Sequence, residues 1–111
     1  MKTDRELLEL AAKASGELTA SWYGNDAYFD GVLSRWNPLT DDGDALRLAV
    51  DLDLAIVPYP IYNKQKHSVL VQKKNIDESR FEKMELHGDD PYAATRRAIT
   101  RAAAAIGESM P

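Results

Sequence analysis

The chain has 111 residues, 44% of them hydrophobic and 29% charged, and a formal net charge of -4, which predicts a single compact domain spanning residues 1–111. The acidic balance disfavours a general binder of phosphate backbones, and the lack of cysteine in the sequence excludes disulfides, thiolate zinc sites and cysteine nucleophiles. Because no run of about 18 apolar residues occurs and the N-terminus is charged, we expect a cytoplasmic protein with no membrane contact.

A helix is predicted at the start of the chain, over residues 3–15, and Gly16 is predicted to end it. Its apolar residues recur at spacings of three and four: Leu7, Leu8, Leu10, Ala11 and Ala14. The segments 18–23 and 27–32 are rich in aromatic and β-prone residues. The residues Gly24-Asn25-Asp26 between them favour a turn, so the two segments predict a short hairpin.

A second helix is predicted after Pro38, with Thr40 or Asp41 as the cap that accepts hydrogen bonds from its first backbone N–H groups. Apolar residues then cover most of its circumference: Ala45, Leu46, Leu48, Ala49, Val50 and Leu52. The residues left as a narrow polar stripe are Asp44, Arg47 and Asp51. This pattern predicts a helix that is covered on most sides.

Three antiparallel strands are predicted next, over residues 55–62, 67–74 and 81–86. Pro58 and Pro60 have the same parity, so their missing N–H donors face one side and mark the first strand as an edge strand. The third segment could equally start a helix, and we favour the strand. One predicted face collects Val57, Tyr59, Ile61, Val69, Val71, Met84 and Leu86, and the other keeps Ile56, Tyr62, Leu70 and Phe81.

The last predicted helix begins at Asp89 or Asp90, has Pro91 in its first turn, and is ended by Gly107. Its predicted inward face consists of Tyr92, Thr95, Ile99, Ala102, Ala103 and Ile106. The residues predicted outside or at the margin are Arg96, Arg97, Thr100 and Arg101. The order α-β-β-α-β-β-β-α therefore predicts an α+β fold with helices layered on a mostly antiparallel sheet.

Two blocks of this pattern, Trp36–Val50 and Ala93–Met110, resemble the phage ABA-sandwich family of small bacteriophage proteins, and the segment Leu7–Ala14 fits the same family. The resemblance implies an origin in a phage or prophage, expression in the bacterial cytoplasm and a helix-sheet-helix layered fold. It implies no catalytic residues. Capping and packing already explain the shared motifs, so the resemblance supports the fold more than any function.

Metal and catalytic chemistry find little support in the sequence. Asp41, Asp42 and Asp44 could hold a divalent cation, but the chain enters a helix directly after them, so capping explains them better. His67 and His87 could pair if their strands are adjacent, but spacing places no third ligand, which favours two exposed histidines. With no nucleophile elbow and no phosphate loop in the sequence, we expect no metal, no cofactor and no enzyme activity.

Two sets of residues are candidates for binding. Arg96, Arg97 and Arg101 form the one local charge anomaly, and the order helix, three strands, helix matches a double-stranded RNA-binding domain. The helix that carries them starts with acidic residues, which favours solvated arginines, some of them paired with Asp or Glu. Trp36 lies in a predicted connection, where a large side chain need not be buried, and is therefore the first candidate anchor for a protein partner.

We therefore expect a non-catalytic binding or accessory protein that acts on a host or phage protein. A homo-oligomer is also expected to be possible, because a second copy would bury an incompletely covered sheet face. The alternative is a nucleic-acid-binding accessory protein. It would use Arg96, Arg97 and Arg101 together with Lys64, Lys66, Lys73 and Lys74, and would bind in a salt-sensitive way.

Overall fold

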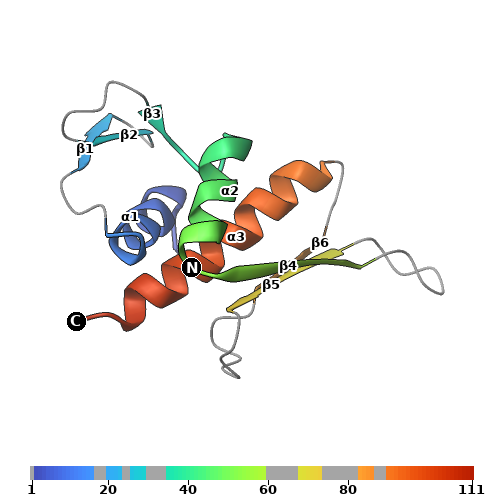
Figure 1. The fold of residues 1–111 in the computed structure, drawn as a ribbon. Coiled ribbons are helices and arrows are strands. Elements are labelled where there is room, and N and C mark those ends of the chain that lie inside the picture. The colour runs from blue at the N-terminus through green and yellow to red at the C-terminus, as the bar shows by residue number, and fades with distance from the viewer. Residues whose placement is uncertain are drawn as a thin grey trace.

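The computed structural model describes residues 2–16, 20–23, 26–29, 35–59, 68–73, 83–86 and 90–111. Within these ranges the chain forms α1 (Asp4–Ala14), β1 (Ala20–Tyr23), β2 (Asp26–Phe29), β3 (Arg35–Trp36), α2 (Asp42–Asp51), β4 (Leu54–Tyr59), β5 (Ser68–Lys73), β6 (Lys83–Leu86) and α3 (Pro91–Ser109) (Figure 1). The predicted α+β class, with helices on an antiparallel sheet, is confirmed. The short strand β3 is an addition to the predicted order.

The first helix has the predicted extent, and a capping box fixes its N-terminus. The Thr3 side chain accepts a hydrogen bond from the Glu6 backbone N–H at 3.2 Å, and the Thr3 backbone N–H donates to the Glu6 carboxylate at 3.2 Å. The chain leaves the helix through Gly16, whose φ of 87° lies in the left-handed region that glycine adopts without strain.

The capping box leads to a pH prediction. Hydrogen bonds from the backbone and then the side chain of Thr3 lower the pKa of Glu6 below its ordinary value. Since the folded-state pKa is lowered, the ionised carboxylate stabilises the helix above the unfolded-state pKa, and this stabilisation is lost as the pH falls through the folded-state pKa. The variant Thr3→Ala is expected to raise the pKa of Glu6 part of the way back, measured by an NMR titration of its carboxyl carbon. An unchanged pKa would contradict the capping box.

The first sheet is antiparallel and has the order β1-β2-β3. The predicted hairpin is confirmed, but Asp26 pairs with Tyr23 and so belongs to the strand rather than to the turn. The turn residues at 24 and 25 lie outside the described residues. The Arg5 guanidinium of α1 lies over the Trp22 ring of β1 at 4.4 Å from its centroid, so a cation–π contact joins this sheet to the helix.

The second sheet has the order β4-β5-β6 and is also antiparallel. The strand β4 is at its edge, as Pro58 predicts. Residues 83–86 form a strand, so the strand rather than the helix is confirmed for this part of the predicted segment. Pro60 and the two histidines lie outside the described residues.

The predicted assignment of residues to the two faces of this sheet is wrong. Ile56 is opposite Val71 and Pro58 is opposite Val69, whereas Val57 is opposite Leu70. Residues directly opposite each other in an antiparallel pair share a face. Val69 and Val71, which are buried, therefore share their face with Ile56 and Pro58 rather than with Val57.

The same shift applies to the register of β6, where Met84 pairs with Leu70 and not with either buried valine. The residues opposite Val69 and Val71 are the charged Glu85 and Lys83. A one-residue change of parity moves every side chain of a strand to the other face. This change brings two charged residues of β6 to the side of the sheet on which α3 lies.

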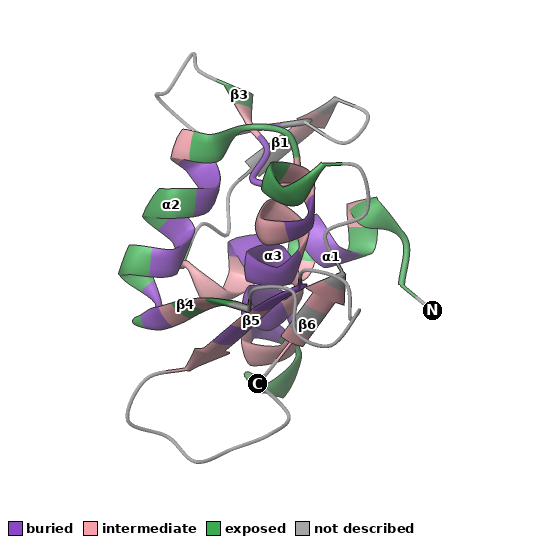
Figure 2. Ribbon diagram, turned by 90° about the vertical axis from the view of Figure 1, so that its right-hand side faces the viewer, coloured by how far each residue is buried: buried purple, intermediate pink, exposed green. Residues whose placement is uncertain are grey.

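The core is organised around α3, which packs against α1, α2, β5 and β6 (Figures 1 and 2). Among the described residues the layers run from sheet to α3 to α1, so the helix-sheet-helix order implied by the family resemblance is not found there. Most of the buried residues of α3 are small: Ala94, Ala98, Thr100, Ala102, Ala103, Ala104 and Gly107. A helix with such a thin profile can be enclosed on several sides at once.

Three predictions about α3 are corrected by this central position. Gly107 does not end the helix, which continues to Ser109. Thr100 is fully buried rather than at the margin, and its hydroxyl donates to the Arg96 backbone carbonyl at 2.8 Å. Tyr92 is 71% exposed rather than inward-facing. The cap at Asp90 and the position of Pro91 in the first turn are confirmed.

The second helix is capped by Asp41, as predicted, but its buried and exposed sides differ from the prediction. Leu46 and Val50 are exposed, whereas Asp44 of the predicted polar stripe is buried. Figure 2 shows the exposed residues on the outer side of α2 and the buried ones toward α3. A helix that is apolar around most of its circumference therefore leaves apolar side chains in contact with solvent.

Candidate functional site

Trp36, the predicted anchor for a protein partner, lies in β3 rather than in a connection. It pairs with Ala27, which is fully buried, and its side chain is half-buried and packs against the core cluster. The predicted connection at this position is a short strand, and the side chain keeps part of its surface in solvent. The structure gives Trp36 a packing role at the edge of the core.

The three predicted arginines lie on different sides of α3. Arg96 faces α2, and its side chain is only 17% exposed. Its Nε donates to the Leu39 carbonyl at 2.9 Å, and its Nη1 donates to the Asp42 carboxylate at 2.6 Å. Arg96 therefore links α3 to the N-terminal end of α2.

Arg97 and Arg101 instead face β6 and the start of α1. The Arg101 Nη1 atom lies 2.6 Å from Glu85 Oε1, and Arg97 Nε lies 4.0 Å from the same oxygen. Arg97 Nη1 also donates to Asp4 at 3.1 Å. The expectation that these arginines pair with acidic groups is confirmed, but the three do not form one basic patch.

An apolar groove runs between α2, β4 and the start of α3 and has a volume of about 210 Å³. Its lining residues are Asp42, Ala45, Leu46, Ile56, Tyr92, Thr95, Arg96 and Ile99. Leu46 is 59% exposed and Ile56 is 37% exposed. Val50, which follows Leu46 by one helical turn, is exposed as well. The sequence pattern missed this site because it could not show which side of the apolar helix α2 faces solvent.

The charged residues that line this groove neutralise each other. Asp42 and Arg96 both line it and form an ion pair at 2.6 Å. At the far end of α2, the Lys73 ammonium group donates to the Leu52 carbonyl, between the exposed Asp51 and Asp53. The described lining of the groove is therefore mainly apolar, with one neutralised ion pair.

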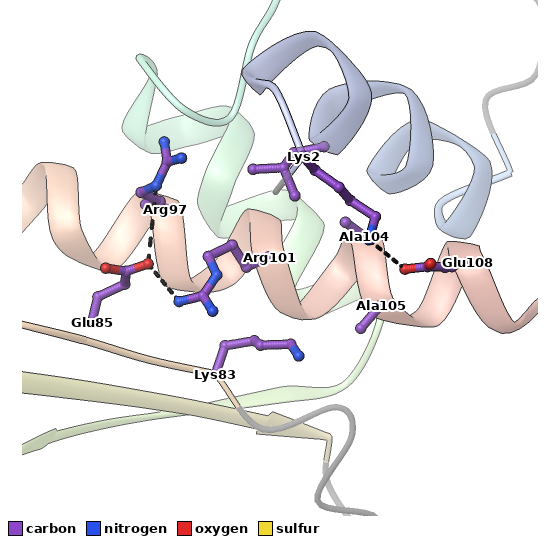
Figure 3. Close-up of a pocket in the computed structure, with 9 residues that line it drawn as sticks. Lys2, Lys83, Glu85, Arg97, Arg101, Ala104, Ala105 and Glu108 are labelled. Carbon is purple, nitrogen blue, oxygen red and sulfur yellow. Dashed lines mark hydrogen bonds and ion pairs between the residues drawn. The ribbon is translucent and has the colours of Figure 1, made fainter.

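A second hollow, which we call the cationic cleft, lies between α3, β6 and the start of α1 (Figure 3) and has a volume of about 520 Å³. Its lining residues are Lys2, Leu7, Lys83, Glu85, Arg97, Arg101, Ala104, Ala105 and Glu108. Cationic side chains outnumber anionic ones. Two of the predicted site residues, Arg97 and Arg101, belong to this cleft.

The aspartates near the start of α2 act as caps and as partners of other side chains. Asp41 accepts from the Asp44 backbone N–H at 2.8 Å. Asp44 accepts from the Asn37 backbone N–H at 2.9 Å and from Arg47 at 2.8 Å. No group of three potential metal ligands occurs within the described ranges.

No helix in the described part of the chain is both long enough and apolar enough to cross a membrane. Comparison with protein-family models, with curated proteins and with solved structures found no match to this chain. The resemblance to the phage ABA-sandwich family therefore stays a prediction.

Proposed function

We propose that the protein is a non-catalytic binding protein whose protein partner docks in the apolar groove between α2, β4 and α3. The observation that carries this proposal is the exposure of Leu46 and Tyr92, which line the groove and each have more than half of their surface in solvent. Large exposed apolar side chains that gather on one surface are typical of interaction sites. Tyrosine is also enriched among the residues that contribute most to binding.

The groove is well supported by the packing beneath it. Arg96 forms one wall and is held by the Leu39 carbonyl and the Asp42 carboxylate. Ala45 and Ile99 are buried below the exposed side chains. A surface built on two packed helices is preorganised, so little conformational entropy is lost when a partner binds.

The lining of the groove suggests the chemistry of the partner. Apolar and aromatic side chains, Leu46, Ile56 and Tyr92, are exposed along it, and its lining charges Asp42 and Arg96 are paired with each other. A partner segment with apolar anchors would complement this surface. We therefore propose an amphipathic segment of a protein as the occupant.

We further propose that the protein is an accessory protein of a bacteriophage or prophage and acts in the cytoplasm of the bacterial host, on a host or phage protein. The support is the resemblance of Trp36–Val50 and Ala93–Met110 to the phage ABA-sandwich family. These blocks contain most of α2 and α3. The two helices that form the groove are thus the segments that carry the resemblance.

The alternative is binding of nucleic acid by Arg96, Arg97 and Arg101. These arginines pair with Asp42, Asp4 and Glu85, and such pairs would have to exchange their carboxylates for phosphates. The arginines also face different sides of α3. This arrangement supports a protein partner over a nucleic-acid backbone, which needs clustered cations along its path.

The experiment that tests the proposal is affinity capture from nuclease-treated bacterial lysate, followed by affinity measurement with the purified partner. Leu46→Gln and Tyr92→Gln are expected to weaken binding by about thirtyfold each, because the loss of an anchor residue costs about 2 kcal/mol. Both residues are exposed, so the variants are expected to keep the stability of the parent protein. Circular dichroism melting checks that stability.

The matched control is Met110→Gln, which makes an exposed apolar residue polar outside the groove. Binding is expected to be unchanged in this variant. Equal binding by the groove variants and the parent protein would contradict the proposal. Recovery of nucleic acid alone would favour the alternative, and a concentration-dependent dimer that Leu46→Gln abolishes would make a second copy of the chain the occupant.

A further inference from the structure

The cationic cleft has chemistry that the proposed function does not use. None of its lining residues lines the groove, and Arg97 and Arg101 lie on the side of α3 away from Arg96. Figure 3 shows Arg101 and Lys83 entering the same space between α3 and β6. The cleft is therefore a second, separate surface.

The charge balance of the cleft favours an anion. Its cationic side chains are Lys2, Lys83, Arg97 and Arg101, and its anionic side chains are Glu85 and Glu108. Asp4, which pairs with Arg97, adds a third carboxylate beside the cleft, so among the described residues the positive charge exceeds the negative charge by one. A phosphomonoester at neutral pH would neutralise this remaining charge, and its further oxygens could accept hydrogen bonds from the paired arginines.

The anionic residues of the cleft also hold the cations in place. Glu85 accepts from Arg101 at 2.6 Å, and Asp4 accepts from Arg97 at 3.1 Å, so each guanidinium group is oriented by a carboxylate. At the other end, Glu108 lies 2.9 Å from the Lys2 ammonium group. The pairs made by Glu85 and Glu108 are drawn in Figure 3. Positioned guanidinium groups are suited to recognising phosphate oxygens through charge-assisted hydrogen bonds.

Lys83 is the cation whose charge a bound anion would neutralise. It is half-buried, and none of the ion pairs among the described residues includes it. It comes to this side of the sheet because it is opposite Val71 in the β5–β6 register. A partly desolvated ammonium group without a counter-charge gains more from a bound anion than a solvated one does.

The floor of the cleft is apolar. Leu7 and Ala104 are buried there, and Ala105 is half-buried. The volume of about 520 Å³ is in the usual range for small-molecule sites. A ligand of this size would place its anionic group beside Lys83 and Arg101 and an apolar or aromatic body on the two alanines.

A long polyanion fits this surface less well than a small ligand does. Beyond the cleft, α1 carries Asp4, Glu6 and Glu9, all of them exposed. A nucleic-acid backbone that left the cleft in that direction would meet negative charge. A compact anion would contact only the cationic side chains.

We propose that the cleft between α3, β6 and the start of α1 binds a small phosphomonoester with an apolar or aromatic body. The charged end is held by Lys83, Arg101, Arg97 and Lys2, and the body lies on Leu7, Ala104 and Ala105. This site is independent of the protein-binding groove. Its occupancy does not require a partner at α2.

The test is an NMR titration of the ¹⁵N-labelled protein with phenyl phosphate, with inorganic phosphate and with single-stranded DNA as separate probes. Phenyl phosphate is expected to bind saturably and more tightly than inorganic phosphate, with amide shifts at Lys83, Ala104 and Ala105. The variant Lys83→Met is expected to weaken phenyl phosphate binding by about tenfold, the loss of one charge-assisted hydrogen bond.

The matched control is Arg47→Met, which removes the same unit charge from the exposed side of α2, outside the cleft. It is expected to leave phenyl phosphate binding unchanged. Equal weakening by the two variants would show attraction to net charge only and overturn the proposal. Absence of saturable binding, or a preference for single-stranded DNA over phenyl phosphate, would overturn it as well.

A second variant, Ala105→Gln, separates the apolar floor from the charged end. The larger side chain is expected to fill the floor and to remove the preference for phenyl phosphate over inorganic phosphate. A preference that survives this change would contradict the position proposed for the ligand body. None of these variants touches the groove, so failure here leaves the proposed protein-binding function standing.

Discussion

Replacing Gly107 by alanine is expected to lower the free energy of unfolding by about 3 kcal/mol, the cost of forcing extra volume into a packed interface. A Cβ atom at this position would lie 2.0 Å from the Leu10 backbone carbonyl oxygen and 2.9 Å from its carbon. Because these atoms belong to backbone, no side-chain rotation can relieve the overlap. The helices α1 and α3 would have to move apart.

This expected result opposes the local preference of the helix. Alanine in a helix interior is favoured over glycine by about 1 kcal/mol, so propensity alone predicts that the substitution stabilises the protein. We expect the cost of the clash to exceed this gain. The helices α1 and α3 are in extensive contact, and Ala11 of α1 belongs to the core, so moving the helices apart would disrupt their packing. Urea denaturation monitored by circular dichroism would measure the change.

Gly43→Ala is the matched control, since Gly43 also lies in a helix. A Cβ atom there would lie 3.2 Å from the Asp41 carboxylate and 3.3 Å from the Arg47 guanidinium, both at the ends of flexible side chains. We expect a change within about 0.5 kcal/mol. If Gly107→Ala proved as mild as this control, the close approach of the two helices would be wrong.

The second large effect is expected from Asp44→Ala. The Asp44 carboxylate is buried, accepts from the Asn37 backbone N–H at 2.9 Å and pairs with Arg47 at 2.8 Å. Alanine would remove the Asp44 oxygen that accepts from the N–H of Asn37, itself a buried residue. We expect a loss of about 2–3 kcal/mol in the free energy of unfolding, because a buried donor without a partner keeps its full desolvation cost.

The loss is expected to affect the whole turn before α2, because Asn37 makes further hydrogen bonds in that turn. Its side-chain oxygen accepts from the Leu39 N–H at 3.0 Å, and its carbonyl accepts from the backbone N–H groups of Thr40 and Asp41. The turn between β3 and α2 therefore depends on the position of this residue. Urea denaturation gives the stability, and amide exchange of Asn37 reports whether its N–H has lost protection.

The matched variants are Asp44→Asn and Asp51→Ala. Asparagine keeps an oxygen for the Asn37 N–H but loses the charge and the oxygen that accepts from Arg47, so we expect a smaller loss of about 1 kcal/mol. Asp51 is exposed on the same helix, and its removal is expected to change stability by less than about 0.5 kcal/mol. Equal losses in Asp44→Ala and Asp51→Ala would contradict the buried hydrogen bond.

Local signals in the sequence were sufficient for most of the elements, although not for β3. Asp41 and Asp90 are each one of the two cap residues predicted for α2 and α3, because each offers its side-chain oxygen to N–H groups within the next three residues. Thr3 caps α1 in the same way. Pro58 marks the edge strand because a missing donor is a property of the residue alone. Such signals act over a few residues and do not depend on the rest of the fold.

The candidate sites depend on contacts between distant segments, and the sequence predicted them only in part. It identified Arg97 and Arg101, but their cleft also needs Lys83, which the strand register brings beside them. The sequence did not predict the groove, because an apolar helix residue such as Leu46 is expected in the core unless the positions of the neighbouring helices are known. The sequence also did not indicate that Trp36 contacts the core. Its strand pairs with β2, and its side chain packs against the core cluster.

The sequence by itself determined the α+β class, the order of the elements apart from β3, and the N-terminal ends of the helices to within one residue, since these follow from hydrophobic periodicity and short-range hydrogen bonds. The tertiary structure alone decided which side of each element is buried. Gly107 became a crossing point, Asp44 a buried acceptor and Lys83 part of a cleft because helix rotation and strand register are set by long-range packing. A rotation or shift of one residue exchanges faces while leaving the local pattern unchanged.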